Sequence, residues 1–271
     1  MKKNKLILIG SITLFALFVI SFVGPILLNK DISAVDLYNI SSPPGGEHLL
    51  GTDELGRDVL ARLMYGGRIS LIVGVIATLL QVIIGVVLGT LAGYFGGITD
   101  VIIMKIVDIV MCFPFFIVAI ALAAIIGPSI YNLIFIITIL SWTSIARIVR
   151  AEIFSIKERD FILASRAVGF NNFDIIRNHI LPNIAPSILV AMTLSMANAI
   201  LTEASLSFLG MGVKSPMPSW GNMLTAAQSM STLSNEWWLW IPPGFMIIVS
   251  VLSINFLGEG LRNSLSIKKE V

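Results

Sequence analysis

The sequence predicts an all-α integral membrane protein with six transmembrane helices. Hydrophobic residues make up 56% of its 271 residues, charged residues make up 13%, and the mean hydropathy is +0.92. Soluble domains are less apolar than this. Six apolar runs are long enough to cross the hydrocarbon core as helices. A lipid-exposed backbone must satisfy its own hydrogen bonds, and the alternation typical of a membrane β-barrel is absent from the sequence. The expected spans are residues 6–28, 69–94, 101–126, 133–149, 184–209 and 239–257.

The first span follows a basic Lys-Lys-Asn-Lys head, as the hydrophobic part of a signal peptide does. Its uncharged stretch is longer than the 7–15 residues of that part, so we expect an uncleaved anchor. The predicted organisation is an N-terminal region, 1–68, holding this anchor, an external loop and an amphipathic helix. A five-span core, 69–271, follows, with a cytoplasmic loop at about 150–183 and an external loop at about 210–238.

Basic residues near the helix ends predict the orientation, because cytoplasmic loops carry an excess of Lys and Arg. With six spans, one side of the membrane holds Lys2, Lys3, Lys5, the basic residues from Arg147 to Arg177, Arg262, Lys268 and Lys269. Both termini are therefore predicted to be cytoplasmic. Four tryptophans then fall at the outer interface, as an aromatic belt or, alternatively, a stacking site for a ligand. They are Trp220, Trp237, Trp238 and Trp240.

The segment 51–70 has the pattern of an amphipathic helix lying on the outer membrane surface. Thr52 is the predicted N-cap, and Val59, Leu60, Leu63 and Met64 share an apolar face. Asp58 and Arg62 are four residues apart and are expected to pair. The acidic residues here do not have the spacing of an EF-hand calcium loop.

A polar break from Arg147 to Asn183 predicts two short helices joined by a tight turn. Ser155 and Glu158 have capping-box spacing, so a helix is expected to start near residue 156. Gly169 has the place of a left-handed residue after a helix. Either Asn171 or Asn172 is expected to cap the second helix, which Pro182 would close. Such a unit is suited to contact another protein or to cover the base of the bundle.

Charged residues inside the spans are costly in hydrocarbon, so each needs a partner, an interface or water. Lys105 with Asp108, and Glu259 with Arg262, have the spacing of ion pairs on one helix; lining of a pathway is the alternative for Asp108. Glu203 has no basic neighbour at helical spacing. We expect either a water-filled pathway or another subunit to accommodate it.

Two features predict how the spans pack. Gly85, Gly89 and Gly93 have the small-xxx-small spacing that allows close helix approach. Pro114 predicts a kink in the third span.

Enzymatic motifs are absent from the sequence, including the phosphate-binding loop, the zinc-binding H-E-x-x-H and the G-x-S-x-G nucleophile turn. His48 and His179 are expected on opposite sides of the membrane, and the single cysteine, Cys112, allows no intrachain disulfide. The net charge of +2 is scattered, which disfavours nucleic-acid binding. We therefore expect no catalytic site, bound cofactor or metal in this chain.

Three ordered motifs resemble one family. The polar break holds Leu163, Ala164, Ser165 and Gly169 and closes on residues 179–183, His-Ile-Leu-Pro-Asn. The other two blocks are Gly-Thr-Asp-Glu-Leu-Gly-Arg-Asp at 51–58, and 201–210 with its continuation at 218–223. Together they resemble binding-protein-dependent ABC importer permeases, in particular the second, C-type permease of peptide and nickel importers. Leu163 stands where that family has an acid, so no role of that carboxylate is carried over.

The resemblance implies a type I ABC importer permease fold and half of a translocation pathway for short peptides. It implies a heterodimer with a related permease, two ATPase subunits that bind ATP and Mg, and an extracytoplasmic solute-binding protein, in the cell membrane of a bacterium or archaeon. Nickel or a metal chelate is the alternative cargo. Two other classes stay open at this point: a secondary transporter or channel working without ATPases, and a membrane enzyme.

The same resemblance suggests which residues make contacts. In the family the cytoplasmic helix pair couples transport to the ATPase. Candidate coupling residues are Arg159, Asp160, Phe161, Ala164, Ser165, Arg166, Val168, Gly169, Phe170 and Pro182. Candidate docking residues for the binding protein are Asp53, Arg57 and Arg62, and candidate pathway residues are Glu203 and Asp108.

Overall fold

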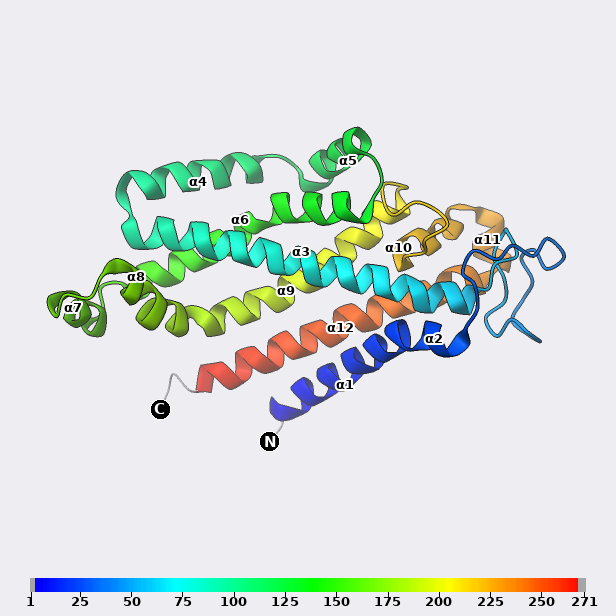
Figure 1. Ribbon diagram of the computed structural model, residues 1–271, viewed down its shortest axis with the longest axis horizontal. Helices are drawn as coiled ribbons and strands as arrows, with labels where there is room; N and C mark the ends of the chain where they lie inside the picture. Colours follow the sequence, from blue (N-terminus) through cyan, green and yellow to red (C-terminus); the bar gives the residue numbers. More distant parts are fainter. Residues whose placement is uncertain (1–2, 268–271) are drawn as a thin grey trace.

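The computed structural model describes residues 3–267 as an elongated bundle of long helices (Figure 1), and these residues form no strand beyond isolated bridges. Lys2, Lys268 and Lys269, used in predicting orientation, lie outside the described residues. The long elements are α1 (Lys3–Phe22), α3 (Val59–Phe95), α4 (Gly97–Cys112), α5 (Phe115–Ile126), α6 (Ile130–Ile156), α9 (Leu181–Phe208) and α12 (Trp237–Ile267). The short ones are α2 (Gly24–Leu28), α7 (Asp160–Ala167), α8 (Asn172–Ile175), the π-turn η1 (Ile176–Ile180), α10 (Trp220–Met223), the 3₁₀ turn η2 (Leu224–Gln228) and α11 (Met230–Asn235).

Five of the described helices are long and apolar enough to cross a membrane, and α4 with α5 gives a sixth span if this bent pair is counted as one. The chain is therefore a multi-pass, all-α membrane protein. The kink predicted at Pro114 is confirmed: the chain bends by 84° between α4 and α5. Phe113 is extended, as a residue before proline prefers, and α5 restarts after Pro114.

The predicted surface helix at 51–70 is wrong. Residues from Val59 onward form the first turns of α3, which is 37 residues long, so the predicted boundary at 68/69 falls inside this helix. At 1.5 Å per residue α3 is about 56 Å long, well beyond the roughly 30 Å of hydrocarbon, so one end projects into water. Its cap is Asp58, whose Oδ1 accepts from the Ala61 amide at 2.9 Å. Thr52 instead donates to the carbonyl of Asn39.

Glycines let α3 and α6 pack closely, as their spacing predicted. A Cβ on Gly89 would lie 2.6 Å from the Ala146 carbonyl oxygen, and one on Gly85 would lie 2.6 Å from the Ile145 Cβ. The helix pair forms the centre of the bundle, with α9 packed against both helices and α12 packed against α1 and α9. The start of α1, the end of α12 and α7 all lie toward one end of the molecule, and the loops around α10 and α11 lie at the other (Figure 1).

Two of the four tryptophans belong to the core at the end of the bundle that holds α10 and α11. Trp220 is fully buried and its Nε1 donates to the Leu63 carbonyl at 3.0 Å, while Trp238 donates to the Thr52 carbonyl at 3.2 Å. Neither tryptophan is therefore part of an aromatic belt or a stacking site for a ligand, and both predictions are wrong for these two residues. Trp237 is half exposed, as a belt residue would be.

Candidate functional site

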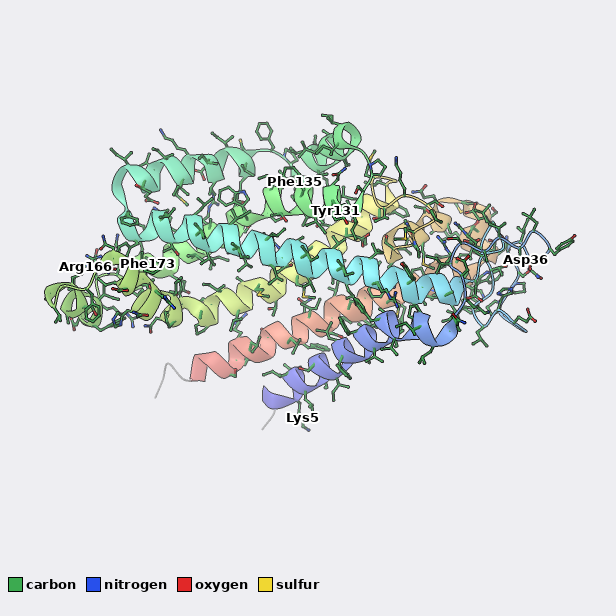
Figure 2. The ribbon with its side chains drawn as sticks, in the orientation of Figure 1. Lys5, Asp36, Tyr131, Phe135, Arg166 and Phe173 are labelled. Carbon is green, nitrogen blue, oxygen red and sulfur yellow. The ribbon has the colours of Figure 1, made fainter. Side chains whose placement is uncertain are left out.

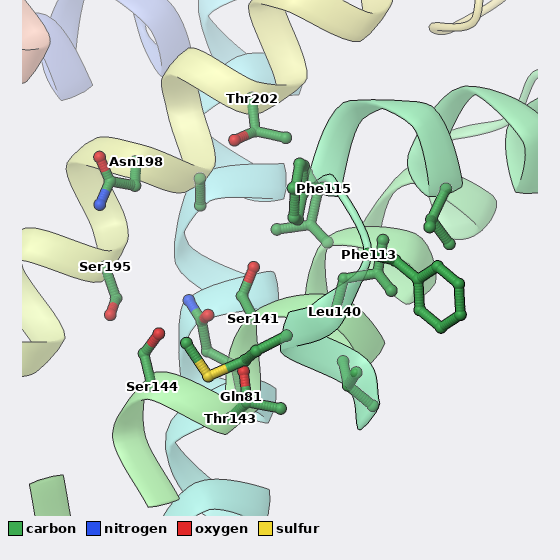
Figure 3. A pocket seen from close by; sticks show the side chains of 15 residues that line it. Gln81, Phe113, Phe115, Leu140, Ser141, Thr143, Ser144, Ser195, Asn198 and Thr202 are labelled. Carbon is green, nitrogen blue, oxygen red and sulfur yellow. The ribbon is translucent and has the colours of Figure 1, made fainter. Parts of the chain in front are cut away.

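A cavity of about 370 Å³ opens between α3, α4, α5, α6 and α9 at mid-bundle (Figure 3). The break at Pro114 shapes one wall, because Phe113 and Phe115 on either side of it both line the cavity. The remaining walls combine apolar residues with seven uncharged polar side chains. These are Gln81, Ser141, Thr143, Ser144, Ser195, Asn198 and Thr202.

Helical spacing brings the polar side chains together. Ser195, Asn198 and Thr202 are at positions i, i+3 and i+7 of α9, which share one helix face. Ser141 and Ser144 are three apart on α6. Figure 3 shows these two stripes on facing helices around the same space. The cavity is thus polar along two of its walls although it lies within apolar spans.

None of these seven side chains forms a hydrogen bond with another residue in the described part of the chain. A polar group left unpaired in hydrocarbon costs free energy, so water or a solute must supply the partners. No charged residue lines the cavity. The cavity is therefore uncharged and can both donate and accept hydrogen bonds.

The sequence prediction missed these residues, because single Ser, Thr and Asn residues are common in membrane helices and usually bond to their own helix. The i, i+3, i+7 spacing of Ser195, Asn198 and Thr202 was the available signal.

The two predicted pathway residues do not line this cavity. Glu203 is fully buried, and its carboxylate accepts hydrogen bonds from Ser70 and Ser207, each at 2.7 Å. The expectation that a pathway or another subunit must accommodate it is wrong, because the chain supplies both partners. Asp108 pairs with Arg147 on α6 at 2.7 Å, and not with Lys105 as its spacing predicted.

Asp108 is 67% exposed, so a pathway role for it stays a prediction. The predicted pair between Glu259 and Arg262 is confirmed, at 3.6 Å.

A second feature lies at the end of the bundle that holds α7 and α8. Five apolar side chains are exposed there, forming what we call the tip surface: Phe161, Leu163, Val168, Phe170 and Phe173. Figure 2 shows Phe173 and Arg166 at this extremity. The opposite face of the same segment is anchored by Ile162, Ile175 and Ile180, which are fully buried against isoleucines of α6 and α9. The segment is therefore held to the spans while presenting an unpaired apolar face.

The turn between α7 and α8 confirms the prediction for Gly169. Its φ is +92°, and the amides of Gly169 and Phe170 donate to the carbonyls of Arg166 (3.0 Å) and Ser165 (3.2 Å), which is a Schellman motif. Asn171 caps α8 by accepting from the Asp174 amide, also as predicted.

Two other predictions for this segment are wrong. Ser155 lies inside α6 and donates to the Glu152 carbonyl at 2.7 Å, so no capping box forms, and α7 begins at Asp160. Pro182 does not close a helix: it sits in the first turn of α9 after the π-turn, and the helix runs on from Asn172 to Phe208.

The candidate coupling residues divide between exposed and covered positions. Ser165 is nearly buried and donates to the Phe161 carbonyl at 2.8 Å. Arg166 lies over the Tyr94 ring, 5.2 Å from its centre, so it also ties the segment to α3. Arg166 is nevertheless exposed, as are the remaining candidates in the described structure: Arg159, Asp160, Phe161, Ala164, Val168, Gly169, Phe170 and Pro182.

At the opposite end, the predicted docking residues form an ion cluster. Asp53 Oδ2 lies 2.8 Å from Arg57 Nε and 3.4 Å from Arg62 Nε. The predicted pair between Asp58 and Arg62 is therefore wrong. The side chains of Asp53, Arg57 and Arg62 are only 14%, 14% and 8% exposed, so they lie below the surface.

Asp58 contacts two basic side chains of the loop that precedes α3. Its Oδ2 lies 2.7 Å from Lys30 Nζ and 2.9 Å from His48 Nδ1. Burial raises the pKa of this carboxyl, but hydrogen bonds from Lys30, the Ala61 amide and His48 outweigh it, and the net pKa lies below its ordinary value. The described residues include no cluster of three or more His, Cys, Asp or Glu that could hold a metal ion.

Residues 85–267 match the family described as the inner membrane component of binding-protein-dependent transport systems. The chain belongs to this family. The permease accordingly has the type I importer permease fold. It is 42% identical over 269 residues to the dipeptide transport system permease protein DppC of Bacillus subtilis strain 168, covering 99% of this chain and 83% of that protein. It is 38% identical to the oligopeptide transport system permease protein OppC of the same strain, covering 98% and 87%. A putative peptide permease of Brucella suis biovar 1 is 40% identical, over 99% and 89%.

Proposed function

We propose that this permease is the transmembrane subunit of an ATP-driven importer of short peptides and forms half of the translocation pathway. The relatives named as dipeptide and oligopeptide permeases support peptide as the cargo. The observation that carries the proposal is the mid-bundle cavity with seven unpaired, uncharged polar side chains. Amide and hydroxyl groups can bond to the backbone groups that all peptides share, whatever their side chains.

The tip surface supports the coupling part of the proposal. An ATPase subunit, which would bind ATP and Mg, is proposed to cover its exposed aromatic side chains, because large apolar groups of this kind serve as anchors in interfaces. The Schellman turn and the buried isoleucines hold the segment rigidly to α3, α6 and α9. A rigid connection of this kind transmits the motion of a partner to the walls of the cavity.

The tip surface is proposed to be cytoplasmic, with both termini on that side, and a second related permease would complete the pathway. An extracytoplasmic solute-binding protein is proposed to dock at the opposite end, where Leu37, Tyr38 and Leu49 of the outer loop are exposed. Asp53, Arg57 and Arg62 lie beneath that surface, so direct docking by these three is not part of the proposal.

Reconstitution tests the proposed function. Proteoliposomes holding this chain, its partner permease and the ATPase subunits should take up a labelled dipeptide only with both ATP and binding protein present. Liposomes holding this chain alone should take up none. Uptake by the chain alone would contradict the proposal and favour a secondary transporter. In the complete system, Asn198→Leu should reduce uptake, because it removes a hydrogen-bonding group from the cavity without adding charge.

A further inference from the structure

A second cavity, of about 210 Å³, lies at the outer end of the bundle beside the Asp53 ion cluster. Two guanidinium groups line it, those of Arg57 and Arg62, and no carboxylate does. The other lining residues are small or polar: Ser207, Gly210, Gly212, Val213, Ser215, Asn222 and Thr225. The cavity is therefore electropositive and rich in hydrogen-bond donors.

The two guanidinium groups are only partly satisfied by the protein. The carboxylate oxygen Oδ2 of Asp53 contacts the Nε atoms of both arginines. Arg62 Nη1 donates to the carbonyls of Ile32 (3.2 Å) and Pro216 (3.1 Å), and Arg57 Nη1 lies 3.4 Å from the Ser215 hydroxyl. In the described part of the chain, Nη2 of each arginine has no hydrogen-bond partner.

Only one carboxylate, that of Asp53, is ion-paired with the two guanidinium groups. Glu54 lines an adjoining cavity with the same two arginines but is ion-paired with neither in the described part of the chain. Arg62 is 92% buried, that is 8% exposed, and it lines the cavity, so its position is fixed. Buried guanidinium groups with free donors favour a planar anion that can accept two hydrogen bonds, which is the geometry of a carboxylate.

We propose that this cavity binds the C-terminal carboxylate of the peptide as it enters the permease from the outside. The inference rests on the proposed function for the identity of the cargo. The recess fits a chain end better than the side chain of a docked protein, because both arginines are less than 15% exposed and the cavity has room for only one or two residues. The neutral mid-bundle cavity would then receive the rest of the peptide without needing a charge of its own.

The first test compares uptake of alanyl-phenylalanine with uptake of its C-terminal amide by the complete transporter. The measured quantity is the ratio of acid to amide uptake, and any preference of the binding protein cancels when variants are compared with the wild type. Arg57→Gln should lower this ratio about tenfold, the effect of losing one charge-assisted hydrogen bond. Lys214 is exposed and lies between the cavity residues Val213 and Ser215 without lining the cavity itself. The control Lys214→Gln should therefore leave the ratio unchanged.

A second pair of variants keeps both arginines. Thr225 lines the cavity, and Thr225→Glu would place a carboxylate there, whereas Thr225→Gln has the same size without the charge. The Glu variant should lose the preference for the acid and the Gln variant should keep it. Equal ratios for these two variants, or an unchanged ratio in Arg57→Gln, would overturn the carboxylate site. Equal loss of acid and amide uptake in Arg57→Gln would instead assign the arginines to assembly or to contact with the binding protein.

A binding measurement separates this inference from the proposed function. Calorimetry on the purified transporter without its binding protein, with the same two peptides as probes, should show tighter binding of the acid in the wild type and not in Thr225→Glu. If this difference is found but reconstituted transporter takes up neither peptide, the proposed function fails and the carboxylate site stands. If the acid and the amide bind equally to the wild type, the site is refuted.

Discussion

The turn at Gly169 offers a quantitative test of coupling through the tip surface. Its φ of +92° is in the region that L-residues avoid, and a Cβ there would meet no atom within 4 Å. A substitution therefore acts through the backbone alone and creates no clash. Replacing glycine at such a position costs about 1–2 kcal/mol, with a larger cost for a β-branched residue and a smaller one for asparagine.

If the ATPase subunit recognises the intact turn, this cost weakens its binding directly. About 1–2 kcal/mol corresponds to about 5–30-fold weaker association of the ATPase subunit with Gly169→Val permease. Gly169→Asn is the matched control, since it also adds a side chain but tolerates positive φ, and it should retain most of the affinity. The assay is titration of the ATPase subunit onto the permease pair in detergent, followed by ATP-driven uptake. Affinities for the Val and Asn variants that agree within twofold would refute the role of the turn.

Three further predictions address helix packing, the loop that precedes α3 and the mid-bundle cavity. Gly89→Ala should lower the thermal stability of the purified permease by about 1–3 kcal/mol, because its Cβ would lie 2.6 Å from a backbone oxygen of α6, whereas Gly45→Ala, with nothing within 4 Å, should not. Asp58 has a folded-state pKa below its unfolded value, so its stabilising effect is present above the unfolded pKa and is lost as pH falls through the folded pKa. Thermal melts between pH 7 and pH 3, about the range over which carboxylates titrate, should show a smaller loss of stability on acidification for Asp58→Asn than for the wild type, and an equal loss in the two proteins would contradict this role of Asp58. Asn198→Leu should lower maximal peptide uptake several-fold while leaving the amount of assembled complex unchanged, and unchanged uptake would argue against a pathway through the cavity.

Local sequence patterns predicted the parts of the structure that depend on local chemistry. Apolar runs of sufficient length gave the spans, and Gly89 and Gly169 were correctly placed because close packing and positive φ leave few alternatives to glycine. Partners of charged groups were not predictable in the same way. Asp108 pairs with Arg147, 39 residues away on another helix, while its neighbour at helical spacing does not pair with it.

The candidate site depended even more on tertiary structure. The mid-bundle cavity takes its polar groups from three helices, and its opening depends on an 84° bend of which the sequence showed only the proline. Glu203 looked unpaired because its partners are serines, one of which, Ser70, is 133 residues away. Single-helix spacing cannot show hydrogen bonds of this kind.

Accessibility of the mid-bundle cavity tests the proposed pathway most directly. Cys112 is the single native cysteine, so Asn198→Cys in a Cys112→Ser background carries one reporter thiol. In the complete transporter this thiol should react with a membrane-impermeant maleimide, and a transported dipeptide should slow the reaction. Ser253→Cys on α12, a buried position outside the cavity, should react slowly with or without peptide. An unreactive Asn198→Cys thiol throughout the ATP cycle, or a reaction rate that peptide does not change, would contradict a peptide pathway through this cavity.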